Sequence, residues 1–166
     1  MVEGSKTSDI KIIGKNRIYT ANELKLDPIN DLAILKVSDD LKPPRGGEFD
    51  FVEPGEQILA IGFPSPNSEI FSENIYISKG IVNSIRKIDI SSERVIFIDA
   101  KIGKGMSGSP LINEMGEVVG IVTLVRYQPI GQSGKGIIGV EDQPAALPIH
   151  LIKKYLIKDT KSALPI

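Results

Sequence analysis

Short runs rich in β-branched residues, separated by Gly, Pro, Asn and Asp, recur along the whole chain. Runs of this length are typical of β-strands, and the residues between them are typical of turns. Many strands at short spacing favour a β-barrel or sandwich over alternating strands and helices. The sequence therefore predicts an all-β fold. The expected strands are 9–13, 17–21, 32–37, 57–61, 75–82, 95–100, 110–113 and 117–125.

Two stretches depart from this pattern. Residues 38–54 are rich in Pro, Gly and acidic side chains, which is typical of a connecting segment. Near the C-terminus, apolar residues spaced to share one helix face predict a helix over 148–158. We therefore expect three parts: residues 1–54, a barrel over 55–147, and a helix and tail over 148–166.

Composition excludes several classes of function. The net charge of -1 and the pI near 5.9 give no basic surface for nucleic acid. The absence of cysteine excludes disulfides, thiolate metal sites and cysteine nucleophiles. No run approaches the roughly 20 apolar residues of a membrane span. Nothing in this sequence directs the chain out of the cytoplasm, although an upstream signal segment would make it an exported protein.

One segment predicts nucleophilic chemistry. Residues 103–111 read Gly-Lys-Gly-Met-Ser-Gly-Ser-Pro-Leu, with glycines on both sides of Ser107. Glycines let the backbone turn tightly and bring successive N–H groups to one point. A nucleophilic serine needs an exposed hydroxyl and nearby amides that stabilise the oxyanion. By itself, the pattern also fits an ordinary glycine-rich hairpin.

Five segments, in order along the chain, resemble serine endopeptidases of the HtrA/Deg kind, which have the trypsin fold. The segment 27–37, Asp-Pro-Ile-Asn-Asp-Leu-Ala-Ile-Leu-Lys-Val, is similar to the one that holds the catalytic aspartate, and 99–111 is similar to the nucleophile segment. The other similar segments are 55–64, 78–82 and 116–121.

This resemblance implies a double β-barrel, with an incomplete N-terminal barrel, a complete C-terminal barrel and a C-terminal helix. It implies that Ser107 is the nucleophile and that Asp31 orients the catalytic histidine. The backbone N–H groups of Gly105 and Ser107 would form the oxyanion hole. The implied reaction is peptide-bond hydrolysis through an acyl-enzyme, with protein or peptide substrates and no cofactor or metal.

The histidine that this mechanism needs is not at the family's position. The sequence has one histidine, His150, which comes after Ser107, whereas the family's histidine precedes the aspartate. Residues 1–4 resemble the family's residues just after that histidine, so we expect its segment and the opening strands of the first barrel to be missing. Lys101 and Lys104 lie near Ser107, but Lys104 is flanked by glycines and is expected to be exposed.

The chain alone is therefore expected to be inactive or nearly so, and whether it works as an enzyme is left open. The alternative is a pseudoprotease that binds extended peptides by strand addition and cleaves nothing. The unpaired edge of an incomplete N-terminal barrel also predicts self-association, which makes a homo-oligomer a candidate assembly.

Overall fold

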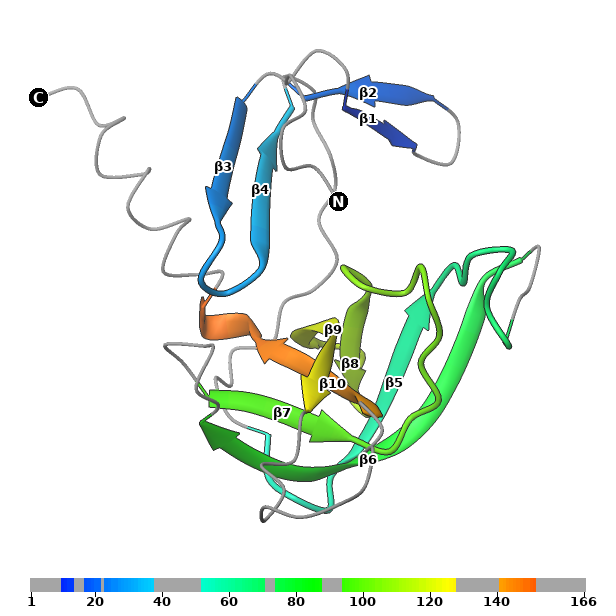
Figure 1. The fold of residues 1–166 in the computed structure, drawn as a ribbon, viewed down its shortest axis with the longest axis vertical. Coiled ribbons are helices and arrows are strands. Elements are labelled where there is room, and N and C mark those ends of the chain that lie inside the picture. The colour runs from blue at the N-terminus through cyan, green and yellow to red at the C-terminus, as the bar shows by residue number, and fades with distance from the viewer. Residues whose placement is uncertain are drawn as a thin grey trace, which may run out of the picture. The chain divides into compact units, whose positions relative to one another are not determined.

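The computed structural model describes residues 10–13, 17–21, 23–37, 52–70, 74–87, 94–127 and 141–151. This part of the chain is almost entirely β-structure, as the sequence predicts, and it forms two compact units (Figure 1). One unit contains β1 (Lys11–Ile13), β2 (Ile18–Thr20), β3 (Glu23–Asp27) and β4 (Leu32–Lys36). The other contains β5 (Gln57–Gly62), β6 (Tyr76–Lys87), β7 (Arg94–Ile98), β8 (Pro110–Asn113), β9 (Val118–Tyr127) and β10 (Glu141–Pro148).

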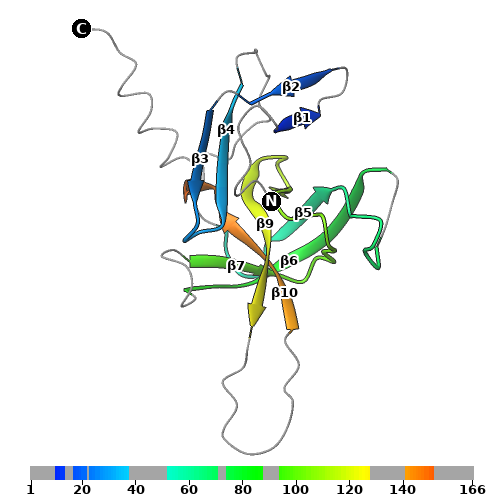
Figure 2. The same cartoon turned by 45° about the horizontal axis from the view of Figure 1, so that its top comes forward.

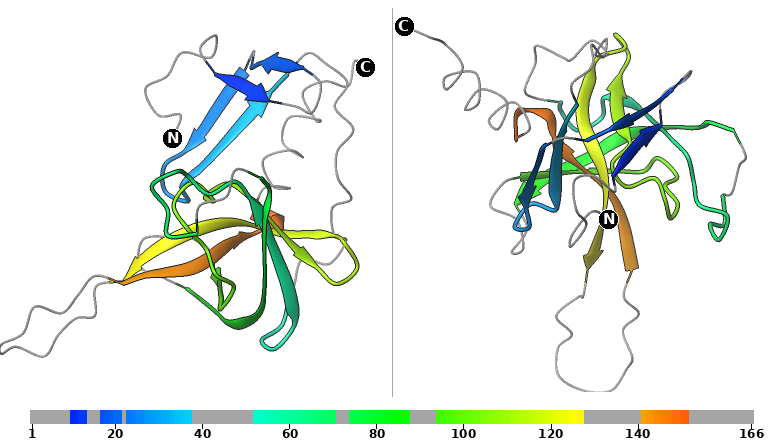
Figure 3. Two further views of the ribbon diagram at one scale, coloured as in Figure 1. Left: turned by 90° about the vertical axis from the view of Figure 1, so that its right-hand side faces the viewer. Right: turned by 90° about the horizontal axis from the view of Figure 1, so that it is seen from above.

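The larger unit is a closed barrel, which confirms the prediction of a complete C-terminal barrel. Its strands follow the order β10-β7-β6-β5-β8-β9 and then return to β10, and all neighbours are antiparallel. The longest pairing joins β9 and β10, which run side by side from Gly120↔Pro148 to Tyr127↔Glu141 (Figure 2). In Figure 3 these two strands form a long ribbon on one side of the barrel.

The barrel core follows from the alternation of side chains along each strand. In β5, Ile58 and Ala60 are buried, whereas Leu59 and Ile61, which alternate with them, are partly exposed. The inward-facing residues of the six strands form one apolar cluster, because a closed barrel leaves them no route to solvent. Its fully buried members include Ile58, Ala60, Val82, Leu111 and Val122.

Strand β7 is buried on both faces, from Val95 to Ile98. On the outer side, the guanidinium of Arg86 lies 4.2 Å from the centre of the Phe97 ring. Arg86 also donates a hydrogen bond to Oε1 of Gln143 over 3.1 Å. The long arginine side chain therefore links β6, β7 and β10 on the outside of the barrel.

The smaller unit consists of two hairpins, β1–β2 and β3–β4. The first confirms the hairpin predicted from 9–13 and 17–21, and β4 confirms the strand predicted over 32–37. Strand β3 was missed, because Glu, Lys and Asp alternate with its leucines and these residues are depleted in strands. Ile13 and Ile18 on the first hairpin are 83% and 66% exposed.

The C-terminal end of the barrel differs from the sequence prediction. Pro148 was assigned to the start of a helix, but it ends strand β10, which was not predicted. Ile149, His150 and Leu151 are helical, and the rest of the predicted helix, 152–158, lies outside the described residues. Most of the connecting segment 38–54 also lies outside them, and the division at 54/55 and 147/148 stays a prediction.

Candidate active site

The predicted nucleophile lies in the loop between β7 and β8. Ser107 is exposed at a turn, and the glycines on either side of it, Gly105 and Gly108, have φ angles of 91° and 89°. This left-handed region is open to glycine and unfavourable for other residues. Two such glycines bend the chain sharply on both sides of Ser107 and present its hydroxyl to solvent. The local conformation therefore explains why glycines stand at these positions.

Strand β9 and the barrel core anchor this loop. Gly108 N donates to Val122 O over 2.8 Å, and Val122 N donates to Ser109 O, also over 2.8 Å. On the other side of the serine, Met106 is completely buried in the barrel core. Ser107 is thus flanked on one side by the buried side chain of Met106 and on the other by two hydrogen bonds to strand β9.

The backbone N–H groups around Ser107 differ in whether they donate a hydrogen bond. Met106 N donates to Gly103 O over 3.1 Å, and Gly108 N is bonded to β9. Within the described part of the chain, the N–H groups of Gly105 and Ser107 meet no hydrogen-bond acceptor. Two amides two residues apart, beside an exposed hydroxyl, are the donors that a tetrahedral oxyanion requires.

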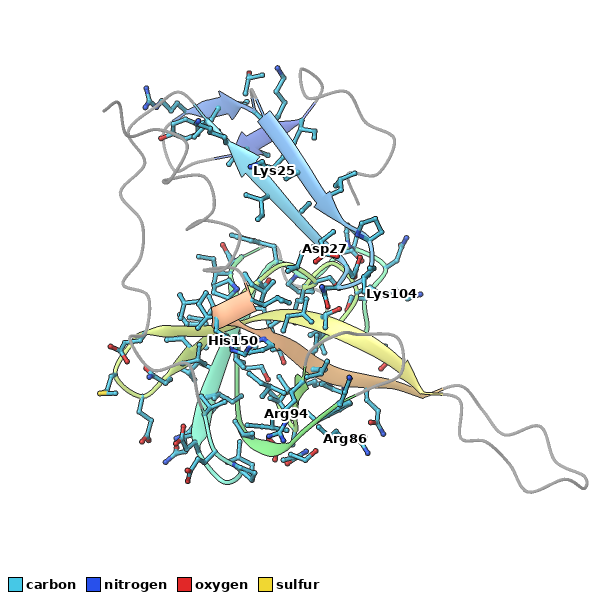
Figure 4. The ribbon with its side chains drawn as sticks, turned by 90° about the vertical axis from the view of Figure 1, so that its left-hand side faces the viewer. Lys25, Asp27, Arg86, Arg94, Lys104 and His150 are labelled. Atoms are coloured by element: carbon cyan, nitrogen blue, oxygen red, sulfur yellow. The ribbon has the colours of Figure 1, made fainter. Side chains whose placement is uncertain are left out.

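The predicted aspartate, Asp31, lies at the turn between β3 and β4. It is exposed and has a φ of 52°, the one non-glycine residue with positive φ among those described. The turn is fixed by Asp27, which lies at the end of β3 (Figure 4). Its Oδ1 accepts from Ile29 N over 3.1 Å and from Asn30 N over 3.2 Å, and its Oδ2 accepts from Asn30 Nδ2 over 2.6 Å. Asn30 is buried, so Asp31 follows a rigid polar turn.

Gly105 and Ser107 share one loop of the barrel unit, whereas Asp31 belongs to the β1–β4 unit. His150 lies in the helical turn after β10 and is partly exposed (Figure 4). Lys101 and Lys104, the candidate replacement bases, are both exposed. A lysine acts as a base where burial disfavours its charged form, and neither has that burial.

Sequence reasoning missed the residues that support these groups. Asp27 and Asn30 were interpreted as part of a family segment and not as the hydrogen-bonded turn before Asp31. The signal was present, because Asp side chains often bond to backbone N–H groups two or three residues later. Ser65 was also missed, although it stands between two prolines. Its backbone N–H donates to Lys104 O, next to Gly105.

Comparison with known proteins assigns this arrangement to a family. A family model described as "Trypsin-like peptidase domain" matches residues 2–121. The chain is 36% identical over 124 residues to a probable periplasmic serine endoprotease DegP-like of Marinomonas sp. (strain MWYL1), covering 73% of this chain and 25% of that protein. It is 32% identical to the serine protease Do-like HtrA of Bacillus subtilis (strain 168), covering 73% of this chain and 28% of that protein.

A solved structure titled "HtrA-type protease AlgW with decapeptide" is similar to this one. The TM-score is 0.62 at 28% identity, and the match covers 86% of this chain and 42% of that chain. The chain thus spans about a quarter of the length of the curated relatives named above.

None of the helical segments among the described residues has the length and apolar character needed to span a membrane. In the same part of the chain, no three His, Cys, Asp or Glu side chains gather in a way that could hold a metal ion.

Proposed function

Because this chain belongs to the trypsin-like peptidase domain family, with HtrA- and DegP-type relatives, we propose that it carries the nucleophile, the aspartate and the oxyanion-binding amides of a serine endopeptidase. The observation that carries this proposal is the loop around Ser107. It combines an exposed serine hydroxyl with two neighbouring amides, those of Gly105 and Ser107, that meet no acceptor among the described residues. The comparisons do not favour the alternative of a non-catalytic peptide-binding module.

In the proposed reaction, Oγ of Ser107 attacks the carbonyl carbon of a peptide bond. The N–H groups of Gly105 and Ser107 donate to the oxygen as it becomes negatively charged. Collapse of the tetrahedral intermediate releases the amine half of the substrate, which takes up the proton that the base received from Ser107, and leaves an acyl group on Ser107. Water then hydrolyses this ester and regenerates the hydroxyl.

The proposed role of Asp31 is to orient the histidine that takes the proton from Ser107. The hydrogen-bonded turn from Asp27 to Asn30 supports this role, because it gives the carboxylate a fixed backbone. The one histidine of the sequence, His150, comes after Ser107 rather than preceding Asp31 as in the family. We propose that His150 is not the base, so that this chain alone hydrolyses peptides very slowly.

The proposed substrates are proteins or peptides.

We also propose that the chain self-associates through the β1–β4 unit. Exposed apolar residues on both of its hairpins, Ile13, Ile18, Leu26 and Ile29, support this. The strand pairing also supports self-association. Among the described residues, each of the four strands bonds to one neighbour, which leaves its other edge open to a strand of another chain. We further propose the division into 1–54, 55–147 and 148–166.

An active-serine phosphonate ester tests the chemistry. Without added base, we expect the chain to react no faster than its Ser107→Ala variant, because the proposed roles assign no base of this chain to accept the proton of the hydroxyl. The measurement is mass spectrometry of the intact protein over time, followed by peptide mapping. Fast labelling confined to Ser107 would show that a base is present within the chain and would overturn this assignment of roles.

A further inference from the structure

The first part of the loop between β5 and β6, residues 63–70, packs directly against the loop that carries Ser107. A Cβ added at Gly105 would lie 2.6 Å from Ser65 N, closer than real Cβ atoms come to atoms of residues that are not their chain neighbours. A Cβ added at Gly103 would collide with side chains of the same loop. At Gly105 the two backbones therefore approach each other directly, whereas at Gly103 the side chains of Ser68 and Ile70 fill the space.

One hydrogen bond joins the two loops at this approach. Ser65 N donates to Lys104 O over 2.7 Å. The described residues contain no cis peptide bond, so the carbonyl of Lys104 and the N–H of Gly105 point in opposite directions. Fixing the Lys104 oxygen toward Ser65 thus turns the Gly105 N–H away from the β5–β6 loop. That N–H is one of the two proposed oxyanion donors.

The donor at Ser65 is itself held by the local sequence, which reads Pro64-Ser65-Pro66. Pro66 restricts the residue before it to extended conformations, and the ring of Pro64 fixes its own φ. Pro64 is buried, and Ser68 N donates to Ser65 O over 2.9 Å. The Ser65 N–H therefore has little freedom to turn away from Lys104.

We propose that the backbone N–H of Ser65 is a positioning group of the active site. By holding the Lys104 carbonyl, it fixes the plane of the 104–105 peptide and with it the direction of the Gly105 N–H. Rotation of that peptide would present a carbonyl oxygen, and no donor, to an anion. The assignment of Gly105 as an oxyanion donor rests on the proposed function above, whereas the link between Ser65 and the orientation of Gly105 does not.

The matched variants are Ser65→Pro, which removes the N–H, and Ser65→Ala, which keeps it and removes only the hydroxyl. In isotope-labelled protein studied by NMR, we expect a scalar coupling across the hydrogen bond from Ser65 N to the Lys104 carbonyl carbon. The wild type and Ser65→Ala should both show it. In Ser65→Pro, the Gly105 amide should change its chemical shift and exchange rate, while the amides of β5 to β10 stay as in the wild type.

A ligand measures the functional consequence. N-acetyl-tri-alanine has a C-terminal carboxylate like that of a cleaved peptide, and its binding is followed at the Gly105 and Ser107 amides. We expect Ser65→Pro to weaken binding at least about tenfold, the loss typical of one hydrogen bond to a charged group. Ser65→Ala should bind like the wild type.

The outcomes separate the two claims. Absence of the coupling in the wild type, or an unchanged Gly105 amide in a folded Ser65→Pro variant, overturns the positioning role. A general structural role is excluded if the strand amides stay constant while Gly105 moves. If the coupling and the Gly105 change are found but the peptide does not shift the Gly105 and Ser107 amides of the wild type, the positioning of the peptide stands and the proposed function fails.

Discussion

The barrel and the β1–β4 unit are built from similar strands but bury them very differently. Every barrel strand pairs with two neighbours, and Ile58 and Val82 in its core are 1% and 0% exposed. Each of the strands β1 to β4 pairs with one neighbour among the described residues, and Ile13 and Ile18 are largely exposed. Isoleucine at a strand position therefore does not by itself indicate a core. Closure of the sheet decides whether the residue is buried.

This difference separates two kinds of stability. A closed barrel satisfies its backbone hydrogen bonds internally, whereas an isolated two-stranded hairpin is only marginally stable in water. We therefore expect substitutions in the barrel to change the stability of the whole unit, and substitutions in the hairpins to act locally. Ser107 and Gly105 come from the barrel unit, whereas Asp31 comes from a hairpin of the β1–β4 unit.

The largest expected effect is in the barrel core. Replacing Leu111, which is completely buried, with Ala should lower the free energy of unfolding by about 2–5 kcal/mol. The cause is lost burial together with the cavity that remains. Urea denaturation followed by circular dichroism measures it. Met115→Ala, at a position 68% exposed, is the control and should change stability by less than about 0.5 kcal/mol. Equal effects would show that the barrel core does not carry the stability.

Self-association should depend on the smaller unit. We expect the mass measured by analytical ultracentrifugation to rise with protein concentration. Ile18→Lys should suppress this rise, because a charge on an exposed strand opposes pairing with another chain. Lys79→Glu, on the exposed side of β6, is the control and should leave it unchanged. A monomer at all concentrations, with the β1–β4 amides protected from hydrogen exchange, would show that this unit is stable without a partner.

The turn before Asp31 should contribute locally. Asp27→Ala removes three hydrogen bonds and leaves the buried side chain of Asn30 without this acceptor. We expect the local opening free energy of the β3–β4 hairpin to fall by about 1–3 kcal/mol. Native-state hydrogen exchange of the hairpin amides reports this change. The barrel amides serve as the internal control, and a matching loss of protection there would contradict the separation of the two units.

The smallest effect concerns the backbone of Asp31 itself. Its φ of 52° is unfavourable for a residue with a side chain, and glycine adopts it freely. Asp31→Gly should therefore leave the hairpin as stable as before or stabilise it by no more than about 1 kcal/mol. Hydrogen exchange of the same amides measures this. A clear loss of hairpin protection would mean that the Asp31 side chain supports the turn, rather than being free for a catalytic role.

The sequence predicted the parts of the fold that depend on local chemistry. The strand predicted at 110–113 and the turn predicted after it are both present. The glycine of that turn, Gly116, has a φ of 78°, and the β-branched residues after it begin strand β9. Strand β10 was missed because Glu-Asp-Gln-Pro-Ala-Ala-Leu-Pro has no β-branched residue. Pro144 lies opposite Leu124 of β9 and just before Ala145 and Ala146, the two residues that pair with β7. Such a strand forms through long-range closure of the barrel.

The same limit applies to the site. The glycine spacing around Ser107 was enough to predict a tight loop, and the positive φ angles of Gly105 and Gly108 fit that interpretation. The bond from Ser65 to Lys104 joins residues about forty positions apart and arises from packing of two loops. No local pattern reports a contact of that kind. The left-handed conformation of Asp31 likewise depends on side-chain bonds within its turn.

The central claim is that Ser107 is a nucleophile with its oxyanion-binding amides in place, and that this chain does not supply the base that the reaction needs. Free imidazole can supply one, because at about pH 8 it is largely neutral and accepts a proton. A positioned general base contributes about 10²–10⁴-fold, so an unlinked one should raise phosphonate labelling of Ser107 at least about tenfold. The rate should increase with imidazole concentration in the wild type and stay flat in Ser107→Ala. Labelling that is independent of imidazole, or no faster at any concentration than in Ser107→Ala, would contradict the account.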